Sequence, residues 1–213
     1  MSGRFRFERV ARIVDRGVVA IVRESDPGTA ESVARGILDA GLDVVEVSVM
    51  TPSAFGCIER LTASYPDALI GAGTVLDDTT ARLALLAGAQ FLVSPTLNVR
   101  ALRVGHRYGA PMVAGVQTPT EVERALSAGA DLLKLFPAST LGVEHLRALV
   151  TVLPQAPLLP TGGVGVENAD LWLGAGAVAL GVGGGLTSAR EDIRSTVGSL
   201  LAAVDASRAA QPA

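Results

Sequence analysis

The stretch AGADLLKLF, residues 128–136, contains the unit that the rest of the chain repeats. Gly129 is the residue type that most readily closes a helix in the left-handed conformation, and the apolar run behind it is typical of a buried strand. A similar pair precedes a further apolar run at four other places: Ala40-Gly41, Ala87-Gly88, Tyr108-Gly109 and Ala175-Gly176. The sequence therefore predicts a repeated helix–glycine–strand module.

Short apolar runs predict eight strands, and the amphipathic stretches between them predict helices. We expect strands at Val18–Arg23, Val44–Met50, Leu69–Thr74, Phe91–Pro95, Met112–Val116, Leu132–Phe136, Leu158–Thr161 and Ala177–Val182. Their alternation with helices favours one α/β domain over residues 1–213, a (β/α)8 TIM barrel with an extra N-terminal helix at 1–17 and a disordered tail at 206–213. A doubly wound open sheet is the alternative, although no glycine-rich fingerprint follows the first strand.

The composition suits a compact α/β protein, with 49% hydrophobic residues, 18% charged residues and 24 glycines. A net charge of −3 gives no basic field for nucleic acid or a membrane surface. Residues 1–17 are too charged for a signal peptide, so we expect a cytoplasmic protein. The N-terminal arginines are expected to form a solvated helix face: Arg4, Arg6, Arg9, Arg12 and Arg16.

Lys134 is the one lysine in the chain, and it stands inside the apolar run Leu132–Phe136. Burial removes the hydration that stabilises an ammonium ion and so favours a neutral amine. A neutral, desolvated lysine is the nucleophile that forms Schiff bases with carbonyl substrates. Any covalent chemistry of this chain is therefore expected at Lys134.

Glu46 is predicted to share the barrel interior with Lys134. Val44, Glu46 and Ser48 alternate with apolar neighbours that should face the helices, which turns the carboxyl group inward. Burial should raise its pKa and suit it to proton exchange near neutrality. The alternative is an ion pair between Lys134 and Glu46 that only holds the barrel together.

Polar residues gather where the predicted strands end, which is the active-site end of such barrels. With Pro95 beside one of them, they are Arg23, Glu46, Ser48, Thr74, Ser94, Gln117, Lys134 and Thr161. Thr161-Gly162-Gly163 and residues 181–185 follow the seventh and eighth strands, where glycines let backbone N–H groups approach a phosphate; simple tight turns are the alternative. His106 and His145 lack metal-ligand spacing, so no metal is expected.

Five segments, in order and at matching intervals, make the chain resemble the class I aldolases for 2-keto-3-deoxy-6-phosphogluconate (KDPG) and 4-hydroxy-2-oxoglutarate (KHG). The segments are Val45–Val47, Gly71–Val75, Phe91–Pro95, Leu133–Ala138 and Pro160–Val164. The resemblance runs from about Val18 to Leu186 and implies a (β/α)8 barrel, a homotrimer and no cofactor.

The resemblance also implies a role for each matching residue. Lys134 would be the Schiff-base lysine and Glu46 the general acid and base, while Thr74 would contact the pyruvate-derived carboxylate. Arg23 matches a substrate-binding arginine of the related phosphogalactonate aldolases. Pro95 and Phe136 would wall the pocket, and the phosphate would lie among Gly162, Gly163, Gly183 and Gly184.

The implied reaction is cleavage of KDPG to pyruvate and glyceraldehyde 3-phosphate. Met50 stands where many members carry an arginine, Gly184 where many carry a serine, and Ala114 where a proline is common. The alternative substrates are therefore KHG and 2-keto-3-deoxy-6-phosphogalactonate. A phosphosugar isomerase or epimerase on the same barrel, with Glu46 as base and no imine, is an alternative of another class. A non-catalytic sensor that binds a phosphate ligand without turnover is a further one.

Overall fold

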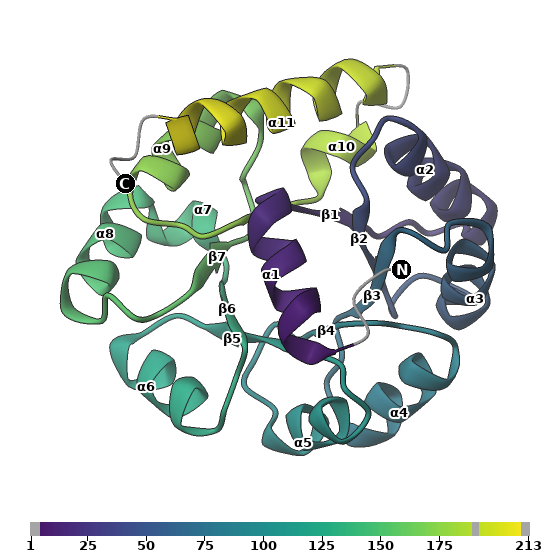
Figure 1. The fold of residues 1–213 in the computed structure, drawn as a ribbon, viewed down its shortest axis with the longest axis horizontal. Helices are drawn as coiled ribbons and strands as arrows, with labels where there is room; N and C mark the ends of the chain where they lie inside the picture. Colours follow the sequence, from purple (N-terminus) through teal and green to yellow (C-terminus); the bar gives the residue numbers. More distant parts are fainter. Residues whose placement is uncertain (1–4, 189–191, 210–213) are drawn as a thin grey trace.

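The computed structural model describes residues 5–188 and 192–209 and shows a closed barrel of eight parallel strands (Figure 1). The strands are β1 (Val18–Val22), β2 (Val44–Ser48), β3 (Leu69–Gly73), β4 (Leu92–Val93), β5 (Met112–Val116), β6 (Leu132–Leu135), β7 (Leu158–Pro160) and β8 (Leu180–Val182). Neighbours pair in the order β7-β6-β5-β4-β3-β2-β1-β8, and a bridge from Thr161 to Gly181 joins the two ends. The predicted (β/α)8 barrel is confirmed, and the open-sheet alternative is wrong.

The helices form an outer ring around the strands, except that α1 lies across the middle of the barrel (Figure 1). They are α1 (Arg6–Arg16), α2 (Pro27–Asp39), α3 (Ala54–Ser64), α4 (Asp78–Leu86), α5 (Val99–Arg107), α6 (Pro119–Ser127), α7 (Ala138–Leu141), α8 (Val143–Val152), the 3-10 turn η1 (Val166–Asn168), α9 (Ala169–Gly174), α10 (Gly184–Ser188) and α11 (Ile193–Ala209). The predicted helix-closing glycines all have positive φ: Gly41, Gly88, Gly109, Gly129 and Gly176. The repeated module is thus confirmed.

Strand alternation divides the apolar residues into two layers. Leu133 and Leu135 of β6 face the helices, while Leu132 faces the barrel interior. The interior cluster consists of Ile13, Val19, Val44, Leu69, Phe91, Val93, Val113, Leu132, Leu159 and Ala179. Lys134 and Glu46 share the inward faces of β6 and β2, because side chains two residues apart on a strand point the same way.

Helix α1 closes the amino-terminal end of the barrel. Ile13 is fully buried in the interior cluster, below the strands. Arg9 donates to the carbonyl oxygens of Gln90 and Gly109, at 3.1 and 2.9 Å. Arg12 and Arg16 form ion pairs with Asp43. The prediction of a solvated arginine face is therefore wrong for residues 6–16, because these side chains bind the turns that precede the strands; Arg4 lies outside the described residues.

Several predicted boundaries shift. Apart from β5, each strand is shorter than predicted, most clearly in Phe91–Pro95, where only Leu92 and Val93 pair as a strand, and in Ala177–Val182, which starts at Leu180. The predicted disordered tail is wrong over residues 206–209, because α11 continues to Ala209 and packs Val204 into the core. Residues 210–213 of that tail and 1–4 of the predicted N-terminal helix lie outside the described residues.

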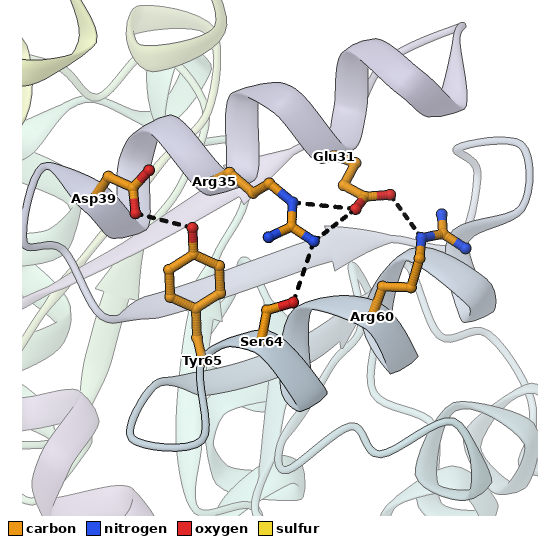
Figure 2. A network of polar contacts seen from close by, with 6 residues as sticks. All are labelled: Glu31, Arg35, Asp39, Arg60, Ser64 and Tyr65. Carbon is orange, nitrogen blue, oxygen red and sulfur yellow. Dashed lines mark hydrogen bonds and ion pairs between the residues drawn. The ribbon is translucent and has the colours of Figure 1, made fainter.

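Helices α2 and α3 are joined on their outer side by a polar network (Figure 2). Glu31 accepts from Arg35 at 2.8 Å and from Arg60 at 2.7 Å, and Tyr65 donates to Asp39 at 2.9 Å. The two arginine contacts hold the pKa of the Glu31 carboxyl below its usual value. Exposed pairs of this kind stabilise a fold only slightly. Their effect here is to fix the two helices that follow β1 and β2.

No helix in the described ranges has the length and apolar character needed to cross a bilayer.

Candidate active site

A cavity of about 510 Å³ lies where the strands end at their carboxyl termini. Most of the residues that the sequence predicts at the site line it: Arg23, Glu46, Thr74, Pro95, Lys134, Phe136, Thr161, Gly162, Gly163, Gly183 and Gly184. Ile21, Ser48, Val164, Glu167 and Gly185 complete the lining. Residues from strands as distant in sequence as β1 and β8 meet here because the barrel brings all carboxyl ends to one face.

Lys134 and Glu46 face each other across this cavity. Their side chains are 8% and 3% exposed, and Lys134 Nζ lies 4.0 Å from Glu46 Oε1. That separation exceeds a hydrogen bond, whereas a buried ion pair stabilises a fold only with close, well-satisfied geometry. The geometry therefore favours two reactive groups over a purely structural pair. The ring of Phe136 lies over the amine, 5.4 Å from Nζ to the ring centre.

Burial raises the pKa of the Glu46 carboxyl, and the positive charges of Lys134 and Arg23 oppose the rise. A carboxyl group with a raised pKa exchanges its proton closer to neutral pH than an exposed glutamate does. The raised pKa expected from the sequence is thus confirmed in direction, with burial as its cause.

Gly73, which the sequence did not single out, makes room for Glu46. A Cβ at position 73 would lie 1.7 Å from Glu46 Oε1. Gly181 does the same for Thr161, whose Oγ1 would lie 2.1 Å from a Cβ there. A glycine inside a strand often marks the close approach of a neighbouring side chain. The two glycines were therefore the sequence signal for this packing.

Thr74 directly follows β3 and has φ of +60°, a left-handed conformation that is rare for a β-branched residue. Such a conformation costs about 1–3 kcal/mol and occurs mostly at functional sites. The Thr74 hydroxyl lies 3.0 Å from that of Ser48 at the end of β2. Both side chains line the cavity beside Glu46.

The loops after β7 and β8 form the glycine-lined side of the cavity. Gly162 and Gly163 have φ of +94° and +73°, and a Cβ added at Gly184 would meet nothing within 4 Å. Helix α10 begins at Gly184, and the Leu186 N–H group donates to the Gly183 carbonyl oxygen at 2.9 Å. The N–H groups of Gly184 and Gly185 precede the helical hydrogen bonds, so they can bind an anion. The Thr161 hydroxyl is buried and has no hydrogen-bond partner within the described ranges. Glu167 adds a carboxylate to the same lining.

Other residues that the sequence singled out lie away from the cavity. His106 contacts Asp131 at 2.8 Å, in the turn that precedes β6, and His145 contacts the Gln117 carbonyl oxygen at 2.7 Å. Gln117 follows β5 but does not line the cavity, because its side chain is exposed and its N–H group donates to Glu121.

The barrel and its enclosed amine and carboxyl groups suit an enzyme of the aldolase class, a carbon–carbon lyase. A profile of the family described as "Aldolase: KDPG and KHG aldolase" matches residues 10–197, and the chain belongs to this family. The resemblance stated from the five sequence segments is thereby confirmed.

Three relatives illustrate the range within the family. The 2-dehydro-3-deoxy-6-phosphogalactonate aldolase of Escherichia coli is 35% identical over 91% of this chain and 95% of the relative. The 2-dehydro-3-deoxy-phosphogluconate aldolase of Treponema pallidum is 36% identical over 76% of each chain. A KDPG aldolase from Legionella pneumophila, solved with pyruvate captured as a covalent carbinolamine, is 28% identical, with a TM-score of 0.79 over 92% of this chain and 97% of that one.

Proposed function

We propose that this aldolase cleaves 2-dehydro-3-deoxy-6-phosphogluconate to pyruvate and glyceraldehyde 3-phosphate through a Schiff base on Lys134. The observation that carries the proposal is the buried pair of Lys134 and Glu46, 4.0 Å apart in one cavity. The carbinolamine held by the Legionella relative supports covalent chemistry in this fold.

The reaction starts when Lys134 gives a proton to Glu46, and the amine then adds to the C2 ketone. Glu46 gives its proton to the departing hydroxyl group, which leaves as water, and the product is a protonated imine that can accept an electron pair. Glu46, directly or through a water molecule, takes the proton of the C4 hydroxyl, and the C3–C4 bond breaks. The bond electrons move into the imine to form an enamine, while C4 leaves as the aldehyde carbon. Glu46 returns its proton to C3, and hydrolysis of the imine frees pyruvate and the amine.

The other lining residues would hold the substrate. In this proposal Thr74 donates to the substrate carboxylate, and Pro95 and Phe136 bound the pyruvate end. The phosphate lies at the glycine-lined side, among Gly162, Gly163, Gly183 and Gly184, beside Thr161. Backbone N–H groups free of Cβ obstruction suit such an anion. Arg23 supplies a charge-assisted contact to the remainder of the substrate.

A second candidate substrate is the galactonate epimer, 2-dehydro-3-deoxy-6-phosphogalactonate. Arg23 lines the cavity, and it matches the arginine that the resemblance assigns to phosphogalactonate aldolases. A relative that this chain covers almost completely carries that name. A third is 4-hydroxy-2-oxoglutarate, because Met50 and Gly184 supply no charged or hydroxyl ligand for a phosphate.

The first test is the mass of the intact protein after incubation with pyruvate and cyanoborohydride. Only Lys134 and the N-terminal amine can react, so Lys134→Arg is a complete control. A single reduced adduct that is absent from the variant supports the proposed imine. A folded wild-type protein without an adduct would refute it and favour the isomerase alternative. The ratio of kcat/KM for the three acids then identifies the substrate.

The assembly and location of the protein belong to the same proposal. We expect a homotrimer in the cytoplasm, as the family resemblance implies, with a small-molecule substrate and neither nucleic acid nor a membrane as partner. Light scattering coupled to size exclusion measures the mass in solution. A mass of one or two chains would contradict the trimer.

A further inference from the structure

Ser48 places a buried hydroxyl beside Thr74 that no step of the reaction uses. It is the last residue of β2, two positions after Glu46, and it is 1% exposed. Its Oγ lies 3.0 Å from Thr74 Oγ1 and 3.3 Å from the amide nitrogen of Met50. The Ser48 hydroxyl thus stands between a backbone donor and a cavity-lining threonine.

The chemistry of these groups sets the direction of the hydrogen bonds. A backbone N–H group can only donate, so the Met50 amide gives its hydrogen to Ser48 Oγ. This leaves the Ser48 hydrogen available for Thr74 Oγ1. A carboxylate can only accept, so a threonine that binds one has to give it its single hydroxyl hydrogen. Thr74 Oγ1 can then accept from Ser48 without conflict.

We propose that Ser48 is a positioning residue for substrate binding: it donates to Thr74 and so turns the Thr74 hydrogen toward the substrate carboxylate. The inference rests on the proposed function, because it requires a 2-keto acid in the cavity. The chain of donors runs from the Met50 amide through Ser48 and Thr74 to the carboxylate oxygen.

A hydroxyl without this partner can rotate among staggered positions. In some of these positions the Thr74 hydroxyl oxygen would point a lone pair at the carboxylate, and the two oxygens would repel each other. The backbone of Thr74 is already fixed by the left-handed turn at the end of β3, so the hydroxyl direction is the remaining freedom. Ser48 affects only the direction of the Thr74 hydroxyl group. Removing the Ser48 hydroxyl should therefore weaken carboxylate binding more than it slows bond cleavage.

The test is a double-mutant cycle on the pyruvate concentration that half-saturates adduct formation with cyanoborohydride. We expect Ser48→Ala to raise this concentration and the KM for the substrate roughly five- to tenfold, with kcat changed by no more than about twofold. In a Thr74→Val background the same substitution should have no further effect. Thr74→Ala provides a second background if Thr74→Val does not fold.

Ser94→Ala is the matched control. Ser94 is equally buried at the end of β4, but its hydroxyl oxygen accepts from the Thr96 amide, within its own loop, at 3.3 Å. The substitution should not change pyruvate binding. An equal loss from Ser48→Ala in both backgrounds, or no loss in either, would overturn the role of Ser48 while leaving the imine in place. A wild-type protein that forms no pyruvate adduct would instead overturn the proposed function, and this inference with it.

Discussion

Replacing Gly73 by alanine tests whether Glu46 has to lie where β3 leaves room for it. The new Cβ would lie 1.7 Å from Glu46 Oε1 and 2.3 Å from its Cδ. Non-bonded heavy atoms pack at about 3.5 Å, so the carboxyl group has to move by roughly 2 Å. The cavity beside it offers the space, because Glu46 lines that cavity.

The displacement should affect catalysis more than folding. Misplacing a catalytic group by about 1 Å can lower a rate about 100-fold, which corresponds to about 2.7 kcal/mol of barrier. We therefore expect kcat/KM of Gly73→Ala to fall by about 100-fold or more. Overpacking in a core costs about 1–3 kcal/mol, so the free energy of unfolding should fall within that range. Lys134 is untouched, and the pyruvate adduct should still form on long incubation.

Pyruvate release can be followed by its reduction with lactate dehydrogenase and NADH, and unfolding by urea. Gly198→Ala is the control, because Gly198 lies in α11 with nothing within 4 Å of the added methyl group. That variant should match the wild type in activity and be equally or slightly more stable. A Gly73→Ala enzyme with kcat/KM close to that of the wild type would refute the placement of Glu46 as the acting base.

Three further outcomes are expected. Ile13→Ala should lower the free energy of unfolding in urea by about 2–5 kcal/mol, since Ile13 is fully buried, and leave kcat near that of the wild type because α1 lies at the other end of the barrel. Burial raises the pKa of Glu46, so the folded state binds its proton more tightly than the unfolded chain and stability falls as pH rises above the ordinary glutamate value of about 4.3. Glu46→Gln should therefore gain stability relative to the wild type as pH rises, measured by urea unfolding. Gly163→Ala should lose at least about 1–2 kcal/mol of stability, because φ is +73° and the added Cβ would lie 2.7 Å from Ser139 Cβ. It should also raise KM for the phosphorylated substrate without weakening the pyruvate adduct.

Each of these three predictions has a result that would contradict it. An Ile13→Ala protein as stable as the wild type would mean that α1 does not seal the barrel. Parallel pH profiles of stability for Glu46→Gln and the wild type would mean that folding does not raise the pKa of the carboxyl group. An unchanged KM for Gly163→Ala would place the phosphate away from this loop.

Periodicity in the sequence predicted most of the barrel and the inward placement of its polar residues. Glu46 could be turned inward because Val45 and Val47 mark the helix-facing side of the same strand. The glycine that closes five of the helices was readable because a left-handed helix end strongly favours that residue. Residues from Arg23 to Gly184 could be assigned to one face of the barrel, because parallel strands have all their carboxyl ends at the same face.

The sequence did not predict how side chains from different strands and helices pack against one another. The glycine at position 73 signals a close approach, but its sequence neighbours do not identify Glu46, on the adjacent strand, as the side chain that fills the space. The left-handed conformation of Thr74 has no local signal either, because threonine disfavours it. The arginines of α1 have the spacing of a solvated face, and only the packing of Ile13 below the strands turns them toward the barrel.

Helix α1 closes the barrel below the interior cluster, and this fixes the order in which the proposed reaction releases its products. With the floor closed, the cavity opens at the carboxyl ends of the strands. In the proposed function, the carbon skeleton tethered to Lys134 would lie deeper than the phosphorylated half. The aldehyde therefore has to leave before water can release pyruvate, and in reverse pyruvate has to enter first. A high concentration of pyruvate should thus hold the enzyme as its pyruvate adduct, which is the form that reacts with an aldehyde in the reverse direction.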